Sequence, residues 1–212
     1  IDAEIMIDHA WGLEPCTMSE IKAYKPSTNS ISEGQVLSEP YDYEHARIIV
    51  AEMADSMVYQ LTDKNLVTDS LTLDAGYDRE NCDKGTYRGP VHIDHYGRSV
   101  PKGAHGSTHL DNPTNLGSTI VTAAVELFDR IVNKSLTVRR ITIAANRVVQ
   151  DEGVYQFDLF TDTEKQEKEK NLQKAMLGIK KKYGKNAVLK GTNYLDGATM
   201  RERNQQIGGH KS

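Results

Sequence analysis

The sequence predicts an α+β domain in which a four-stranded antiparallel sheet carries two helices on one face. Three observations predict it. Some segments alternate apolar and polar residues, as strands do, and two longer ones repeat apolar residues every three or four positions, as helices do. Between residues 30 and 150 these segments follow one another as strand, helix, strand, strand, helix, strand. That order is the split βαβ arrangement, βαββαβ, which leaves one face of its sheet open.

The first three elements occupy the segment up to residue 77. Ser30–Leu37 alternates in polarity and predicts a strand with a kink at Gly34. A helix is expected from about Asp42, because Asp is a favoured N-cap residue and apolar residues then recur with helical spacing as far as Leu61. Val67–Tyr77 alternates apolar residues with Thr and Asp, which is typical of a half-buried strand.

The last three elements follow a long excursion. Asp78–Tyr96 is rich in Gly and charge, and Arg98–Leu110 reads as an extended strand that is polar on one side. Residues 112–115, Asn-Pro-Thr-Asn, are expected to break the chain and to offer caps. Leu116–Val132 then predicts the second amphipathic helix, and Val138–Val149 predicts the final strand.

Two flanking parts complete a three-part division into residues 1–29, 30–150 and 151–212. Ile1–Trp11 has a short helical pattern and leads into a linker, so residues 1–29 read as the helical remnant of a preceding domain. Residues 151–212 are expected to form a helical tail. Its helix should begin with a capping box from Thr161 to Glu164 and end at Gly184. We expect Gly197–Ser212 to be disordered when unbound. One apolar stripe of the helix comprises Leu172, Met176, Ile179 and Tyr183.

Composition limits the classes of function. The 212 residues include 26 Lys and Arg against 30 Asp and Glu, a net charge of −4, which counts against a dedicated nucleic-acid module. Local basic segments can still bind phosphate, and Lys165–Lys190 and the pair Arg139-Arg140 are such segments. Two cysteines, Cys16 and Cys82, indicate a reducing cytoplasmic setting, and no apolar run approaches the roughly 20 residues of a membrane span. We therefore expect no membrane partner.

The pentapeptide Gln156-Phe157-Asp158-Leu159-Phe160 follows the last predicted strand. Its apolar side chains either cap the core from an edge strand or remain exposed for a partner. Extended peptides of this kind bind by placing side chains in apolar pockets while a polar residue fixes the register. Because Val138–Val149 already completes the sheet, the second interpretation is favoured.

Several segments in order resemble the Y-family translesion DNA polymerases, the UmuC-like ImpB/MucB/SamB type of Gram-positive bacteria. They match the end of that family's thumb, the first, third and fourth strands of its little finger domain, and its C-terminal tail. The matching segments are Ile1–Ile5 with Asp8–Gly12, Asn29–Ser32, Gly97–Lys102, Arg139–Ile143 and Met200–Lys211.

The resemblance implies that residues 30–150 form a little finger, which grips primer–template duplex DNA through its sugar-phosphate backbone. Such contacts position a protein without reading sequence. Ile141 and Ile143 must face the helices, so Arg140 is expected on the open face and Arg139 on the other side. The candidate DNA-binding residues are Ser30, Ser32, Gly34, Gln35, Arg98, Ser99, Lys102, Gly103, His105, Ser107, Arg140 and Thr142.

The resemblance also implies a role for Gln156–Phe160 as the peptide that binds the ring-shaped sliding clamp. Leu159 and Phe160 would fill the apolar pocket, Gln156 would anchor through its amide, and Asp158 would stay at the rim. The whole protein would be an error-prone polymerase of DNA repair and the SOS response, with Mg²⁺ held by palm carboxylates. We expect those carboxylates to precede Ile1, so this segment alone carries no catalytic residue, metal or cofactor.

Three alternatives stay open at this level. An RRM-like RNA-binding module shares the order of elements but needs aromatic residues on its central strands. A metal enzyme could use His92, His95, His105 and His109, although their spacing is weak and no Cys joins them. The Lys-rich helix Lys165–Lys182 is either a solvated face or a contact for single-stranded template or a partner.

Overall fold

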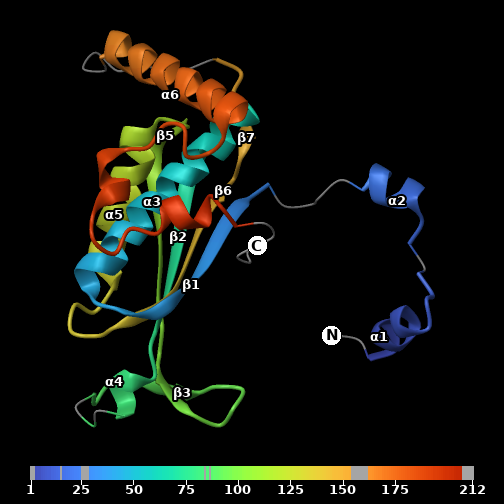
Figure 1. The fold of residues 1–212 in the computed structure, drawn as a ribbon, viewed down its shortest axis with the longest axis vertical. Helices are drawn as coiled ribbons and strands as arrows, with labels where there is room; N and C mark the ends of the chain where they lie inside the picture. The colour runs from blue at the N-terminus through green and yellow to red at the C-terminus, as the bar shows by residue number, and fades with distance from the viewer. Residues whose placement is uncertain are drawn as a thin grey trace.

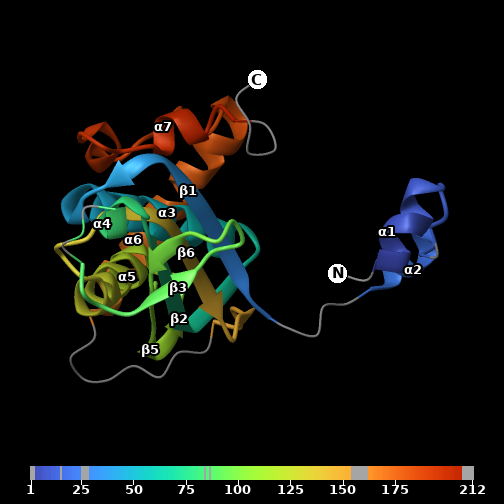
Figure 2. The ribbon, with the colours of Figure 1, turned by 90° about the horizontal axis from the view of Figure 1, so that it is seen from below.

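The computed structural model describes residues 3–14, 16–24, 29–83, 85, 87–153 and 162–206, and it contains the expected sheet. Neighbouring strands are antiparallel and lie in the order β1-β6-β2-β5. Helices α3 (Tyr43–Asp63) and α5 (Gly117–Ile131) cover one face of it (Figures 1 and 2). The strands are β1 (Ile31–Tyr41), β2 (Leu66–Tyr77), β5 (Ala104–Thr114) and β6 (Val138–Asn146), with the short β7 (Val149–Gln150) paired to the start of β2.

The remaining elements lie around this βαββαβ unit. The excursion after β2 contains the helix α4 (Glu80–Asp83) and a hairpin of β3 (Val91–Ile93) and β4 (Ser99–Pro101). Two short helices precede the sheet, α1 (Ala3–Ala10) and α2 (Met18–Ala23). The tail consists of α6 (Thr163–Tyr183), the 3₁₀ helix η1 (Gly191–Tyr194) and α7 (Met200–Arg203).

Alternation along the strands separates the buried face of the sheet from the open one. In β6, Ile141, Ile143 and Ala145 are fully buried in the core between the sheet and the two helices. Arg140 and Thr142 alternate with them and point to the opposite face, because adjacent strand residues face opposite ways. The helices contribute the other half of the core, including Ile49, Met53, Met57, Leu61, Ile120, Leu127 and Phe128.

A polar contact joins the two covering helices at the rim of the core. The Arg47 Nε on α3 lies 2.9 Å from Oδ1 of Asp129 on α5, and the Tyr43 hydroxyl donates to the same carboxylate. Burial raises the pKa of Asp129, but the hydrogen bonds from Arg47 and Tyr43 outweigh burial and hold that pKa below its ordinary value. The carboxylate is therefore ionised at neutral pH and fixes α3 beside α5.

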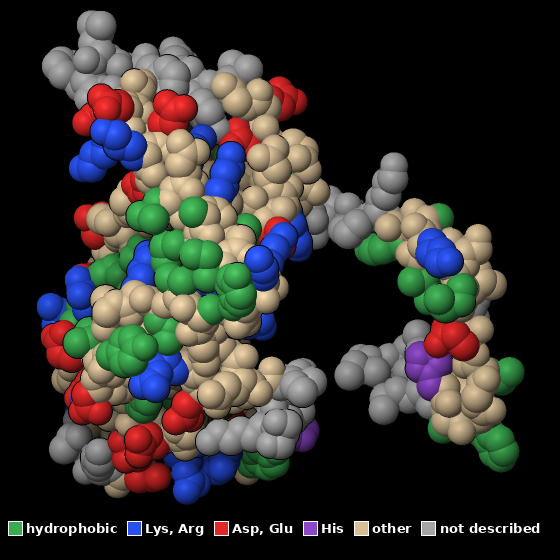
Figure 3. Space-filling model, turned by 45° about the horizontal axis from the view of Figure 1, so that its top comes forward, with side chains coloured by type: hydrophobic (Ala, Val, Ile, Leu, Met, Phe, Trp, Pro, Cys, Tyr) green, Lys and Arg blue, Asp and Glu red, His purple; other side chains and the backbone are tan. Residues whose placement is uncertain are grey.

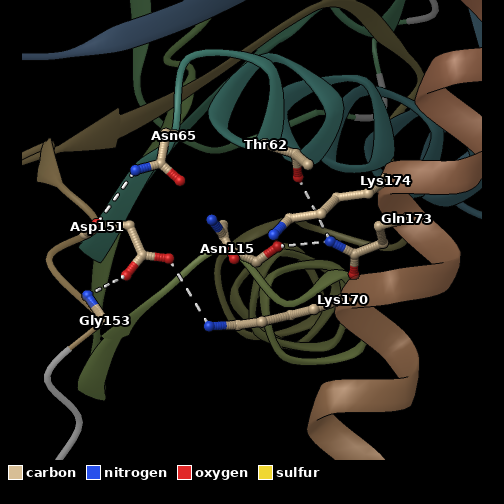
Figure 4. Close-up of a pocket in the computed structure, with 8 residues that line it drawn as sticks. All are labelled: Thr62, Asn65, Asn115, Asp151, Gly153, Lys170, Gln173 and Lys174. Atoms are coloured by element: carbon tan, nitrogen blue, oxygen red, sulfur yellow. Dashed lines mark hydrogen bonds and ion pairs between the residues drawn. The ribbon is translucent and has the colours of Figure 1, made fainter.

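The tail helix α6 supplies the caps of α5. The N-cap residue Leu116 has no side chain that could bond the free amides of the first turn. Instead, the Gly117 amide donates to Gln173 Oε1 at 2.7 Å and the Ser118 amide donates to Glu169 Oε1 at 2.7 Å. Gln173 is 8% exposed and also donates to the carbonyl of Asn115 at 3.0 Å (Figure 4). The tail therefore belongs to the folded unit.

The buried carboxylate of Glu52 on α3 holds the end of the tail. Glu52 is 2% exposed, and it accepts hydrogen bonds from Asn193 Nδ2 at 2.8 Å and from the amides of Thr199 and Met200 at 2.8 and 3.0 Å. Ion pairs flank this contact on α3 and β1. They join Lys190 to Asp55, Lys181 to Asp63 and Arg203 to Glu33.

Several expectations for the tail and loops are wrong. Asp162, not Thr161, caps α6, since its side chain accepts from the Lys165 amide. The disorder expected for Gly197–Ser212 is wrong for residues 197–206, where Thr199 and Met200 bond Glu52 and α7 forms, and residues 207–212 lie outside the described residues. Residues 112–115 do not break the chain. Instead β5 runs to Thr114, which pairs with Thr68 beyond a bulge.

The apolar stripe of α6 is not its packing face. Leu172 is 60% exposed and Tyr183 is 67% exposed, whereas the polar Gln173 is buried. The spacing of apolar residues alone therefore predicts the wrong face of α6. The helix docks through the side chains of Gln173 and Glu169, which accept hydrogen bonds from the free amides at the start of α5. The predicted end of the helix at Gly184 is confirmed, with a φ of 98°.

Close packing of α5 on β5 predicts a destabilised Gly106→Val variant. A Cβ at Gly106 would lie 2.8 Å from Ile131 Cγ2 and 3.2 Å from Leu127 Cδ1. We expect the free energy of unfolding in urea to fall by about 1–3 kcal/mol or more. Gly178→Ala is the control, since a Cβ added there on α6 would meet no atom within 4 Å, and it should gain about 0.5–1 kcal/mol. Equal stabilities for the two variants would contradict the packing.

The buried Glu52 predicts release of the tail in Glu52→Ala. The substitution leaves the Thr199 and Met200 amides without their acceptor, at about 1–3 kcal/mol for an unsatisfied buried group. Amide hydrogen exchange at these two residues should accelerate, while exchange in β6 stays slow. Glu44→Ala, at an exposed position of the same helix, should change neither rate. Unchanged exchange at Thr199 would show that the tail is held elsewhere.

Candidate nucleic-acid interface

The candidate interface is the sheet face opposite α3 and α5, which we call the open face. The register aligns its residues in rows across the four strands, for example Gly34, Thr142, Asp74 and His105. The next row consists of Ser32, Ala144, Thr72 and Ser107. Small and hydroxyl side chains dominate these rows, so a polyanionic backbone could approach the strands closely.

Arg140 is the cation at one end of the open face. It lies opposite Gly76 on β2 and Val36 on β1, and its side chain is exposed. Gly76 has no side chain. A Cβ added there would lie 3.5 Å from the Cβ of Arg140, in van der Waals contact with it. The neighbouring Arg139 pairs with Asp78, its Nε 3.7 Å from the carboxylate. The structure thus separates the two arginines as the alternation predicts, with Arg140 on the open face.

Two imidazoles extend the polar surface along β5. His105 Nδ1 lies 2.7 Å from Oδ1 of Asp74, so the imidazole and the carboxylate are paired on this face. His109 lies 3.1 Å from Nη2 of Arg147, whose Nε donates to Asp69 at 2.8 Å. Arg147 is a second cation of this face that sequence reasoning missed. Arg147 lies just after the end of β6 with a φ of 49°. The alternation of a strand predicts a face only for residues within the strand, so it could not place Arg147.

The structure places the predicted residues of β1 on two different faces. Ser32 and Gly34 lie on the open face, and Ser30 is exposed just before the strand. Gln35 does not lie on the open face, so its predicted place among the DNA-facing residues is wrong. It shares the helix side with Ile141, and its Nε2 donates to the Thr199 hydroxyl at 3.0 Å, so it helps to hold the tail.

The predicted residues of the third strand are also divided. His105 and Ser107 lie on the open face, but Arg98, Ser99, Lys102 and Gly103 precede β5. Arg98 and Ser99 belong to the β3–β4 hairpin, whereas Lys102 and Gly103 form the link to β5. Gly103 lies against β2, where an added Cβ would be 3.0 Å from the Ala75 carbonyl oxygen. The expectation that all six lie on one strand is therefore wrong.

The hairpin tip is held by Asp94. Its carboxylate accepts from the Tyr96 amide at 2.8 Å, the Arg98 amide at 2.9 Å and the Arg98 guanidinium at 2.7 Å. The Arg98 side chain, followed by its backbone amide, lowers the pKa of Asp94 to about 2. Arg98 is therefore paired within the hairpin and is a weaker candidate for phosphate than Arg140.

The tail presents a mixed electrostatic surface. Lys181 and Lys190 pair with acidic residues of α3, and Figure 3 shows basic and acidic side chains interspersed on the face that includes the tail. The Lys-rich helix thus docks on an acidic helix instead of forming a basic patch. The predicted clamp-binding residues Gln156, Phe157, Asp158, Leu159 and Phe160 lie outside the described residues.

Other site types find little support in the described part of the chain. On the two central strands β2 and β6, the two rows named above carry Asp74, Thr72, Thr142 and Ala144, none of which is aromatic, so the stacking platform of an RRM is missing there and that alternative is not supported. Within the described ranges, no three His, Cys, Asp or Glu residues come together as a metal site. His105 and His109 instead contact Asp74 and Arg147.

The described helices include none whose length and apolar character would let it cross a membrane.

Comparison with known proteins finds one matching family model and two curated relatives of similar sequence. The family model described as the impB/mucB/samB family C-terminal domain matches residues 28–159. The chain is 27% identical over 207 residues to the putative UV-damage repair protein UvrX of Bacillus subtilis, covering 96% of this chain and 44% of that protein. It is 28% identical over 111 residues to DNA polymerase IV 2 of Halalkalibacterium halodurans, covering 52% of this chain and 26% of that protein.

The chain thus spans less than half the length of these curated relatives. Among solved structures, it resembles the complex of the beta-clamp processivity factor and the little finger domain of PolIV, with a TM-score of 0.38 and 9% identity. That match covers 63% of this chain and 100% of the other. Because the family model matches more than half of the sequence, the chain belongs to the impB/mucB/samB family and carries its C-terminal domain.

Proposed function

We propose that the open face grips the sugar-phosphate backbone of primer–template duplex DNA on behalf of a translesion polymerase. The observation that carries this proposal is the row structure of the face, in which the exposed Arg140 lies beside Gly76 and the neighbouring rows carry Gly34, Thr142, Ser32 and Thr72. Small residues let a backbone approach, hydroxyls donate to phosphate oxygens, and a guanidinium pairs with phosphate. None of these groups reads a base, which suits an enzyme that must accept damaged templates.

The net charge of −4 does not conflict with this role. Acidic residues such as Asp55, Asp63 and Glu33 are paired with the tail on the opposite side of the sheet. At physiological salt, charges more than about 8 Å apart are largely screened from each other where they face solvent. Local charge on the open face therefore governs binding, and the exposed Arg140 supplies it, whereas Arg147 is paired with Asp69.

Tethering to the sliding clamp is the second part of the proposal. It rests on the pentapeptide Gln156–Phe160, which follows the completed sheet after Gly153. Leu159 and Phe160 would occupy an apolar pocket of the clamp, and Gln156 would fix the register. The little finger would then hold the polymerase on DNA through two contacts of different chemistry.

The polymerase reaction and its Mg²⁺ belong to the proposed whole protein. The described acidic residues do not fit a catalytic metal pair, because no group of three candidate ligands converges among them. Those we place by contact, such as Glu52 and Asp129, hold helices or the tail together. We assign no step of nucleotide transfer to this chain.

Arg140→Ala tests the DNA contact. A charge-assisted hydrogen bond contributes about 1.5 kcal/mol, so duplex affinity should fall about tenfold. The plot of log affinity against log salt should become shallower by about one unit, since one phosphate contact is lost. Both quantities follow from fluorescence anisotropy with a labelled duplex at several salt concentrations. Arg139→Ala, whose guanidinium pairs with Asp78, is the matched control and should change little. Equal losses in both variants would argue against the open face.

Leu159→Ala combined with Phe160→Ala tests the tether. Removing two anchor side chains should weaken binding to the purified clamp at least about thirtyfold, the loss of a single hot spot of about 2 kcal/mol, because hot-spot losses do not add. Duplex affinity should stay at the wild-type value, which also verifies folding. Asp158→Ala is the control for a rim position. Clamp binding that survives the double substitution would refute the peptide assignment.

A further inference from the structure

The β3–β4 hairpin projects from the end of the sheet, and its tip presents an aromatic side chain. Tyr96 lies in the turn between the two strands and is 77% exposed. Figure 1 shows the hairpin beyond the ends of β2 and β5, and Figures 1 and 2 together place it on the side away from α3 and α5. A ring this exposed does not stabilise the core, so most of its surface is available to a partner.

Hydrogen bonds and ring contacts within the tip hold this ring in place. Asp94 bonds the Tyr96 and Arg98 amides, and Gly97 provides the turn with a φ of 76°. The Arg98 guanidinium lies 4.8 Å from the centroid of the Tyr96 ring, and the His95 ring meets it edge-on at 5.4 Å. Asp94 fixes Arg98 in turn, so neighbours on both sides hold the tyrosine while most of its surface stays in solvent.

The hairpin also lies at the same end of the sheet as Arg140. The chain leaves the sheet after Tyr77 on β2 and returns at Ala104 on β5. Arg140 is opposite Gly76, the residue just before Tyr77. A DNA backbone held at Arg140 would therefore continue toward the hairpin.

The chemistry of Tyr96 selects the form of DNA. In a duplex the faces of the bases are covered by their neighbours, so an aromatic ring finds no base to stack on without unpairing one. Unpaired bases expose their π-faces and stack on Tyr, Phe or Trp, and the contact tolerates any base. Resting on the proposed grip of the open face, we propose that the hairpin tip stacks an unpaired base of the single strand that continues from the duplex, with Tyr96 as the platform and Arg98 as its positioning residue.

The test compares three labelled DNA probes in anisotropy titrations of the full 212-residue chain. The first is a blunt duplex, the second adds a short single-stranded thymidine overhang, and the third replaces the overhang bases by abasic sites. The wild type should bind the thymidine overhang more tightly than the other two, because only it offers unpaired bases to stack. Tyr96→Ala should remove this gain, about fivefold or more in affinity, and leave the blunt-duplex affinity unchanged.

Two further variants control the result. Tyr96→Phe keeps the ring and should retain the gain, whereas Tyr183→Ala removes a tyrosine of similar exposure on α6 and should have no effect. Equal weakening of all three probes by Tyr96→Ala would assign the hairpin to duplex backbone and overturn the proposal. A gain that survives Tyr96→Ala would overturn it as well. Failure of the proposed grip is distinguishable, since it appears as blunt-duplex binding that Arg140→Ala does not weaken.

Discussion

Burial of one face of the sheet beneath α3 and α5 is the constraint on which the rest of the structure depends. Because side chains alternate along a strand, packing Ile141 and Ile143 into the core fixes Arg140 and Thr142 on the other side. A shift of one residue in the register would exchange the two sets and bury a guanidinium. The same hydrophobic packing that stabilises the domain therefore arranges its polar face. The candidate interface needs no separate scaffold, because the packing of the core sets which side chains lie on it.

Polar contacts complete what hydrophobic burial leaves open. The tail brings Gln173 and Glu169 to the bare start of α5, and it brings backbone amides to the buried Glu52. Each contact satisfies a group that would otherwise be costly to bury. The acidic surface of α3 and the lysines of the tail neutralise each other on one side of the sheet. This arrangement leaves positive groups such as Arg140 and Arg147 free of that acidic surface.

Periodicity predicts the elements of this domain well because each long segment has one clearly apolar side. The order of elements, the Asp42 cap and the separation of Arg139 from Arg140 follow from the sequence alone. The same alternation separates Gln35 from its neighbour Gly34, so the wrong position of Gln35 comes from not applying it along β1. The docking of the tail does not follow from the sequence, because α6 docks through Gln173 while Leu172 stays exposed. The hairpin inside residues 78–103 depends on Asp94 contacts made within a few residues, which apolar spacing cannot report.

The caps that α6 places on α5 have a consequence for synthesis on the ribosome. Chains emerge from their N-terminus, and early segments begin to fold before later ones exist. All four main strands and both covering helices are complete by Asn146, but the amides of Gly117 and Ser118 gain their acceptors only when Glu169 and Gln173 have emerged. Until then, the amides in the first turn of α5 can be bonded only by water. The segment from α6 onward acts as the closing step of folding for this domain, and a chain that stopped before it would leave the start of α5 and Glu52 without these partners.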